Sequence, residues 1–170
     1  MRQPKKFCSL CGGKLVKTRD ENRERLVCAE CGQISYENPL PATCAVLLDC
    51  EGNILLTRRA VEPALGEWSL PGGFVEIDEN PEECILREIE EETGLTGRIV
   101  AQIGVRGQKS GMYINIMIAG FLVKAVGGDL RAGDDASEVR WFNRATLPEL
   151  PFESHTEFLR KALDDIGGFL

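Results

Sequence analysis

Residues 80–95, NPEECILREIEEETGL, constrain the chain most, because they specify a complete helix with an unusual charge distribution. Asn80 suits the N-cap, Pro81 the first helical position and Glu83 the acidic position of a capping box. Gly94 predicts a left-handed end to the helix. Three consecutive glutamates fill the last turn, where the helix dipole and neighbouring like charges both disfavour them.

The clustered acids of this helix need an explanation. At ~100° per residue, Glu88, Glu91 and Glu92 fall on one side of the helix, whereas Arg87 and Glu90 point elsewhere. One interpretation is a solvated acidic face, because each repulsion costs only a few tenths of a kcal/mol at a surface. The other is a site for a hard divalent cation such as Mg²⁺, which prefers carboxylate oxygens together with substrate phosphates.

The surrounding spacing favours the cation site. The stretch GFVEIDENPEECILREIEEETGL matches the pattern G-x5-E-x7-R-E-U-x-E-E-x-G-U at Gly73, Glu79, Arg87, Glu88, Ile89, Glu91, Glu92, Gly94 and Leu95. At typical residue frequencies, a chance match in a chain of this length is roughly a one in ten million event. The stretch resembles the Nudix box, and the chain is therefore similar to Nudix hydrolases.

The resemblance implies a fold and a reaction. It implies an α/β sandwich with a mixed sheet between helices for residues 39–170, and hydrolysis of a nucleoside diphosphate linked to another group, with Mg²⁺ or Mn²⁺ as cofactor. Glu88, Glu91 and Glu92 match the metal-binding and base-supplying acids of the family, and the carbonyl of Gly73 matches a further ligand. We expect Glu91 to be the base, although the roles permute within the family.

Other residues are candidates for supporting parts of the site. By resemblance, Glu79 and Arg87 form a charged pair that braces the loop against the helix. Glu138 resembles an additional metal-ligating glutamate of family members with a zinc ribbon, or else it is a solvent-facing strand residue. Arg58 and Arg59 end a predicted strand that faces the loop before the box, where guanidinium groups bind phosphate well. Solvation at the surface is the alternative for one of them.

The cysteines predict a second module. Two C-x-x-C pairs, each followed by glycine and separated from one another by sixteen residues, contain Cys8, Cys11, Cys28 and Cys31. This spacing is typical of a zinc ribbon, predicted for residues 1–38, in which Zn²⁺ has no open position and serves folding. Disulfides in a small secreted domain are the alternative. The remaining cysteines are expected to be small buried hydrophobic residues: Cys44, Cys50 and Cys84.

The remaining chain is predicted to form several strands and a final helix. Residues 36–42, YENPLPA, contain two prolines, which disfavour a regular element and predict a stiff linker. Residues 113–125 are apolar enough for a central strand of a sheet. Further strands are expected at residues 13–18, 24–28, 43–50, 54–59, 98–108 and 137–143, and an amphipathic helix at residues 155–166.

Charge and hydropathy limit the partners. Residues 1–38 carry eight basic and five acidic side chains, a net charge of +3. Residues 39–170 carry twelve basic and twenty-two acidic side chains, a net charge of −10. The acidic part argues against broad nucleic-acid binding and requires cations to admit an anionic substrate. No apolar run is long enough to cross a membrane and no secretory leader is evident, so a cytoplasmic location is expected. A homodimer through the ribbon or the sheet is a further hypothesis.

The order of the modules suggests a substrate class. A ribbon before a Nudix domain resembles NADH pyrophosphatases and their relatives that cleave ADP-ribose or FAD. Residues 96–117 lack the S-Q-P-W-P-F-P-x-S motif of the NADH enzymes, so FAD or ADP-ribose, with release of AMP, is preferred. The alternatives are NADH, nucleotide caps on RNA, and a non-catalytic ligand sensor in gene regulation. Trp68, Phe74 and Tyr113 are candidates for stacking on a base, or else belong to the core.

Overall fold

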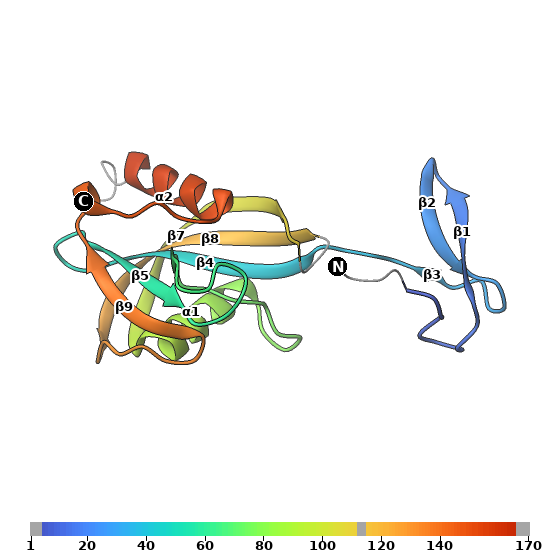
Figure 1. Ribbon diagram of the computed structural model, residues 1–170, viewed down its shortest axis with the longest axis horizontal. Coiled ribbons are helices and arrows are strands. Elements are labelled where there is room, and N and C mark those ends of the chain that lie inside the picture. Colours follow the sequence, from blue (N-terminus) through green and yellow to red (C-terminus); the bar gives the residue numbers. More distant parts are fainter. Residues whose placement is uncertain (1–4, 112–114, 166–170) are drawn as a thin grey trace.

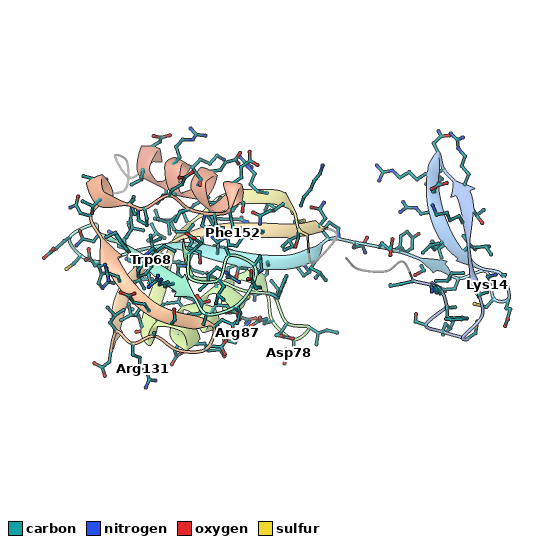
Figure 2. All side chains as sticks on the ribbon, in the orientation of Figure 1. Lys14, Trp68, Asp78, Arg87, Arg131 and Phe152 are labelled. Carbon is teal, nitrogen blue, oxygen red and sulfur yellow. The ribbon has the colours of Figure 1, made fainter. Side chains whose placement is uncertain are left out.

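A computed structural model describes residues 5–111 and 115–165 of the chain, in which two separate sheets are present. The small N-terminal sheet has the antiparallel order β1–β2–β3. Its strands are β1 (Leu15–Asp20), β2 (Arg23–Cys28) and β3 (Ile34–Ser35). Figure 1 shows that an extended segment joins this ribbon to the larger domain, and Figure 2 labels Lys14 on the ribbon, apart from the other labelled residues.

The larger sheet has six strands in a mixed arrangement. Its order is β6–β5–β4–β8–β7, with β9 paired to β5. Strands β4 and β8 are parallel, and the other neighbouring pairs are antiparallel. The apolar strand β8 lies inside the sheet, as its composition predicts. The strands are β4 (Leu40–Leu48), β5 (Ile54–Arg59), β6 (Trp68–Ser69), β7 (Leu95–Lys109), β8 (Asn115–Gly128) and β9 (Ala136–Phe142).

Helices cover both faces of this sheet (Figure 1), which confirms the predicted α/β sandwich. Successive residues of β4 face opposite sides, so Leu47 packs with the apolar side of α1 (Pro81–Thr93), whereas Val46 packs with α2 (Glu153–Asp165). A short 3₁₀ helix, Arg144–Thr146, follows β9. None of the helices in the described ranges has the length and apolar character needed to span a membrane.

The predicted ends of α1 are confirmed. Asn80 accepts a hydrogen bond from the N–H of Glu83 at 2.9 Å, and the Glu83 carboxylate accepts from the N–H of Asn80 at 2.9 Å. Gly94 ends the helix with φ of 70°, in the left-handed region. The local signals therefore place the acidic residues of the last turn as the sequence predicts.

Two expectations about the fold are wrong. Strand β4 begins inside the predicted linker and includes Pro41, which is tolerated near the start of a strand because its carbonyl still accepts, here from Val75 at 3.2 Å. Cys44 and Cys84 are buried as expected, but Cys50 is exposed. It lies in the turn between β4 and β5, where Oδ1 of Asp49 accepts hydrogen bonds from the N–H groups of Glu51 and Asn53.

Candidate active site

A cleft of about 600 Å³ runs along the segment that matches the box. Its lining includes all three predicted acids, Glu88, Glu91 and Glu92, which α1 carries on adjacent turns. Gly73 and Arg59 contribute from the loop before α1 and from the end of β5. The structure therefore brings the three predicted catalytic acids, the predicted ligand Gly73 and one predicted phosphate-binding arginine to one cavity.

Two glycines let the backbone approach the acids closely. Gly72 has φ of 149°, and a Cβ there would lie 2.2 Å from the carbonyl oxygen of Thr43. A Cβ on Gly73 would lie 2.3 Å from Oε1 of Glu88. The carbonyl of Gly73, a predicted metal ligand, accepts a hydrogen bond from the N–H of Thr43 at 2.8 Å. A carbonyl oxygen has a second lone pair, which stays available for a ligand.

Two of the box acids are buried carboxylates. Glu92 is 5% exposed, its Oε2 accepts from the N–H of Gly72 at 3.1 Å, and burial raises its pKa to about 8. Glu88 is 9% exposed, and burial raises its pKa although Arg87 opposes the effect. A divalent cation beside these oxygens would offset their desolvation. The donor set therefore fits Mg²⁺ or Mn²⁺.

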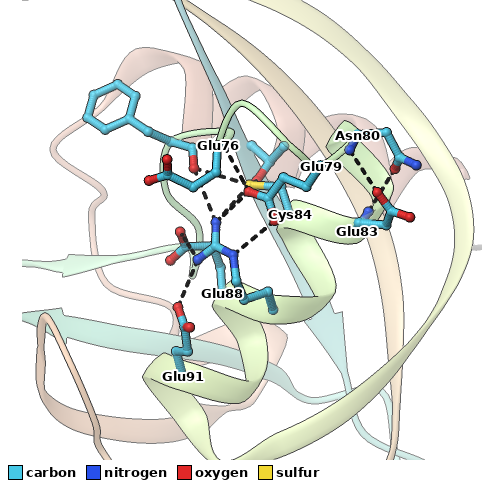
Figure 3. A network of polar contacts seen from close by, with 10 residues as sticks. Glu76, Glu79, Asn80, Glu83, Cys84, Glu88 and Glu91 are labelled. Atoms are coloured by element: carbon cyan, nitrogen blue, oxygen red, sulfur yellow. Dashed lines mark hydrogen bonds and ion pairs between the residues drawn. The ribbon is translucent and has the colours of Figure 1, made fainter.

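Figure 3 shows the polar network between Glu79 on the loop and Glu88 and Glu91 on the helix. Arg87 connects these acids. Its Nε and Nη2 donate to the two carboxylate oxygens of Glu79 at 2.9 and 2.6 Å, which is the predicted bracing pair. Nη1 donates to both Glu88 Oε1 and Glu91 Oε2 at 2.8 Å. The expectation that Arg87 points away from the acids is therefore wrong. The helix directs its Cβ away, but the long side chain bends back because Glu79 holds the guanidinium there.

The two candidate arginines separate at the end of β5. Arg59 lines the cleft, where Nε donates to the carbonyl of Pro63 at 2.6 Å and the guanidinium lies over the ring of Phe152. Arg58 is not part of the cleft lining; it donates to the carbonyl of Gly66 at 2.8 Å and pairs with Glu138 at 3.6 Å. Alternation along a strand explains the difference, because neighbouring side chains point to opposite faces.

Glu138 lies outside the residues that line the cleft. Pairing of β9 with β5 places it opposite Arg58, and Arg140 binds its other carboxylate oxygen. With side-chain exposure of 36%, it matches the alternative of a solvent-facing strand residue. Its role as a metal ligand stays a prediction, which would require these ion pairs to open.

The candidate aromatic residues also differ in position. Trp68 packs edge-on against Phe142, with 5.0 Å between ring centroids, and is partly buried against the core that lies beneath α2. Phe74 lines the cleft and is partly exposed. Tyr113 lies outside the described residues. Figure 2 labels Trp68, Phe152 and Arg87 in the larger domain.

Several residues of the cleft were missed from the sequence: His155, Gln108, Asp134 and Asp135. His155 is the single histidine of the chain, and its Nδ1 accepts a hydrogen bond from the N–H of Leu70 at 3.2 Å. Its rarity was a signal that could have drawn attention to it. The paired aspartates one residue before a predicted strand were a second signal.

The four predicted zinc ligands lie together in the ribbon. Cys8, Cys11, Cys28 and Cys31 are free thiols whose sulfur atoms lie within 4.8 Å of one another. The N–H groups of Leu10 and Gly13 donate to the sulfurs of Cys8 and Cys11 at 3.4 Å. Backbone N–H groups lower the pKa of Cys28 to about 7, despite burial. Such thiolates, gathered in two knuckles, fit a tetrahedral Zn²⁺ ion.

Known proteins resemble both modules. Residues 6–37 match the family described as Nudix N-terminal, a zinc ribbon, and residues 38–165 match the NUDIX domain. An ADP-ribose pyrophosphatase of Methanocaldococcus jannaschii is 37% identical over 144 residues, which cover 82% of this chain and 78% of the relative.

A protein named NAD-capped RNA hydrolase NudC, from Vibrio atlanticus, is 28% identical over 88% of this chain, which spans only 54% of the relative. The crystal structure of a NUDIX hydrolase from Nitrosomonas europaea superimposes with a TM-score of 0.83, at 28% identity, and covers 96% of this chain and 94% of that one. With a complete box in a cleft and matches over both modules, the chain belongs to the Nudix family and is a Nudix hydrolase with an N-terminal zinc ribbon.

Proposed function

We propose that this Nudix hydrolase cleaves the pyrophosphate bond of ADP-ribose or FAD and releases AMP, with Mg²⁺ or Mn²⁺ as cofactor. The observation that carries the proposal is the complete set of box acids, Glu88, Glu91 and Glu92, along one cleft. The substrate class is supported by the name of the relative with 37% identity. ADP-ribose and water would give AMP and ribose 5-phosphate, and FAD and water would give AMP and FMN.

The described residues divide into binding and proton-transfer roles. Glu88, Glu92 and the Gly73 carbonyl would hold the divalent cations. When bound, such cations offset the charge of the diphosphate and make water more acidic. Glu91 has 46% side-chain exposure, so its carboxylate is accessible to accept the proton of the attacking water. The water oxygen bonds to phosphorus, and the bond from phosphorus to the leaving phosphate oxygen breaks.

Arg59 is the proposed phosphate-binding cation of the cleft. Its Nε donates to the carbonyl of Pro63, and no other hydrogen bond or ion pair of the Arg59 side chain is found among the described residues, so its two Nη groups can bind a phosphate oxygen. Arg58 is a weaker candidate, because its contacts with Gly66 and Glu138 hold it away from the lining. Zn²⁺ in the cysteine cluster would stabilise the ribbon and take no part in hydrolysis.

Hydrolysis of an NAD-type linkage at the end of an RNA is the second candidate. The relatives named NAD-capped RNA hydrolase NudC favour it, since they match 86–88% of this chain. The balance of −10 over residues 39–170 disfavours a long RNA contact on that domain. The segment after the box supports a different substrate from NADH, because residues 96–117, which include Gln108 of the cleft lining, lack the NADH-enzyme motif.

A substrate panel tests the proposal. The purified protein is incubated at millimolar Mg²⁺ or Mn²⁺ with ADP-ribose, FAD, NADH, NAD, dinucleoside polyphosphates and an NAD-capped oligoribonucleotide, and AMP is identified by chromatography. We expect AMP from ADP-ribose or FAD, and little from NADH. Preferential cleavage of the capped oligoribonucleotide would favour the second candidate, and no cleavage of any compound would favour a ligand sensor.

A further inference from the structure

His155 is the single histidine of the chain and lies in the first turn of α2. Its residue exposure is only 9%, and its ring packs edge-on against Phe152 with 5.0 Å between centroids. The imidazole is also part of the cleft wall, together with Arg59, Glu88 and Glu92. A buried polar ring is therefore built into the catalytic cleft, where the proposed reaction does not yet use it.

One nitrogen of this ring is already occupied. Nδ1 of His155 accepts a hydrogen bond from the backbone N–H of Leu70 at 3.2 Å. A ring nitrogen that accepts carries no proton, so the proton of the neutral ring lies on Nε2. Burial, with the nearby Arg59 as the second cause, lowers the pKa of His155 to about 3. The ring is neutral at pH 7 and keeps one tautomer, with its N–H donor at Nε2.

The other nitrogen faces open space. No acceptor within residues 5–111 and 115–165 bonds to Nε2. Those residues contain no side-chain nitrogen or oxygen that is both fully buried and without a partner. Nε2 is therefore not sealed in the protein, and the open space that the ring borders is the cleft. A donor in this position is satisfied by water or by an acceptor atom of a bound ligand.

The surroundings of His155 indicate which acceptor this is. The N–H of Leu70 donates to the imidazole. Two residues further along the same segment, the N–H of Gly72 donates to the carboxylate of Glu92. The donor therefore lies on the same wall as the acids that define the reacting end of the cleft. The guanidinium of Arg59 lies 5.5 Å from the centre of the Phe152 ring, which itself contacts His155. A neutral donor next to a cation favours an anionic oxygen.

We propose, building on the pyrophosphatase function above, that Nε2–H of His155 donates a hydrogen bond to a phosphate oxygen of the bound nucleotide. The ring cannot take the proton of the attacking water, because the Leu70 N–H occupies Nδ1 and Nε2 is already protonated. His155 is a substrate-contacting donor, and the role of general base stays with the glutamates of α1.

Nuclear magnetic resonance observes this donor directly. Labelling histidine alone with ¹⁵N gives the signals of one imidazole, since the chain has one histidine. We expect a protonated Nε2, an unprotonated Nδ1, and a change in the Nε2–H signal when AMP and Mg²⁺ are added. AMP has no pyrophosphate bond, so the spectrum reports binding without turnover. Adenosine serves as the control without phosphate and should leave the Nε2–H signal in place.

Variants give an independent measurement. His155→Leu removes the donor and should raise KM for the hydrolysed substrate roughly ten- to a hundredfold, the effect of losing one hydrogen bond to a charged group, with a smaller change in kcat. His155→Gln offers an amide oxygen to Leu70 and an amide N–H to the ligand, and should stay within about threefold of the parent. Thr156→Ala, at the exposed next position of α2, is the matched control. The Gln variant and the spectra remain informative if the Leu variant does not fold.

The outcomes separate this inference from the proposed function. A shift of the Nε2–H signal with AMP, without hydrolysis of any compound, would support the inference and contradict the proposed pyrophosphatase activity. Hydrolysis together with an unchanged Nε2–H signal at saturating AMP, or no AMP binding by calorimetry, would overturn the inference alone. An equal response to adenosine, or a proton found on Nδ1, would overturn it as well.

Discussion

Gly72 donates its backbone N–H to Oε2 of Glu92 at 3.1 Å, across a separation of twenty residues. This bond fixes a buried carboxylate of α1 against the loop that precedes the helix. The same glycine has a φ of 149° and lies directly against the backbone of Thr43 in β4. Sheet, loop and helix therefore meet at one residue that has no room for a side chain.

Gly72→Ala should destabilise the protein and impair catalysis. Its Cβ would lie 2.2 Å from the Thr43 carbonyl oxygen, so the backbone must shift and the contact with Glu92 is lost. We expect a loss of roughly 1–3 kcal/mol in the free energy of unfolding, measured in urea. Gly107→Ala, with no atom within 4 Å of the added Cβ, is the control and should change stability little. Equal effects of the two substitutions would contradict the role of Gly72.

Substitution of the box acids should separate activity from folding. Glu91→Gln or Glu92→Gln should lower turnover roughly a hundredfold or more, as expected for loss of a base or a metal ligand. Circular dichroism should show a folded protein in each case. Glu90→Gln removes a charge from the same helix on its exposed side and should retain activity. Retained activity in both site variants would refute the assignment of the cleft.

Arg87→Lys should weaken catalysis although the charge is kept. A lysine ammonium cannot reproduce the two-pronged contact with Glu79 while it also reaches Glu88. We expect kcat/KM to fall roughly ten- to a hundredfold, the range seen when a contact that orients metal ligands is lost. Glu79→Gln tests the other side of the pair. If the pair acts as one unit, the double variant should be little worse than either single variant.

Zinc content should depend on the ribbon cysteines alone. We expect one zinc ion per chain by elemental analysis, because the part of the chain that the structure describes contains one group of four sulfurs that can hold it. Cys28→Ser should remove the metal and the structure of the ribbon. Cys50→Ser alters an exposed cysteine outside the cluster and should keep the zinc. Full zinc content in the Cys28 variant would rule out the proposed site.

The free energy of unfolding should decrease as the pH is lowered, partly because of His155. Burial lowers its pKa in the folded protein to about 3, whereas the unfolded chain binds a proton near the ordinary value of 6.5. The stabilising effect of the neutral ring is complete above pH 6.5 and is lost as the pH falls toward 3, with a limiting slope of about 1.4 kcal/mol per pH unit. Urea unfolding between pH 7 and 4.5 measures it. The slope should be shallower in His155→Gln, and an identical slope would argue against a buried neutral ring.

The parts of the site that follow from local chemistry were predictable from the sequence. Asn80 and Gly94 specify both ends of α1, and the spacing of Glu88, Glu91 and Glu92 within one helix places them on one side. The two C-x-x-C pairs likewise predict a sulfur cluster, because each pair forms its own tight knuckle. These features depend on short stretches of backbone whose geometry nearby residues determine.

Only the tertiary structure decided what depends on contacts between distant segments. Arg87 bends back over the acids because Glu79 on the loop holds it, Glu138 pairs with Arg58 through the register of β9 on β5, and His155 bonds Leu70 across a separation of 85 residues. A sequence pattern gives the direction of each Cβ, but it does not give the partner that a long or buried side chain meets. That partner depends on how the sheet brings together strands and helices that are remote in the chain.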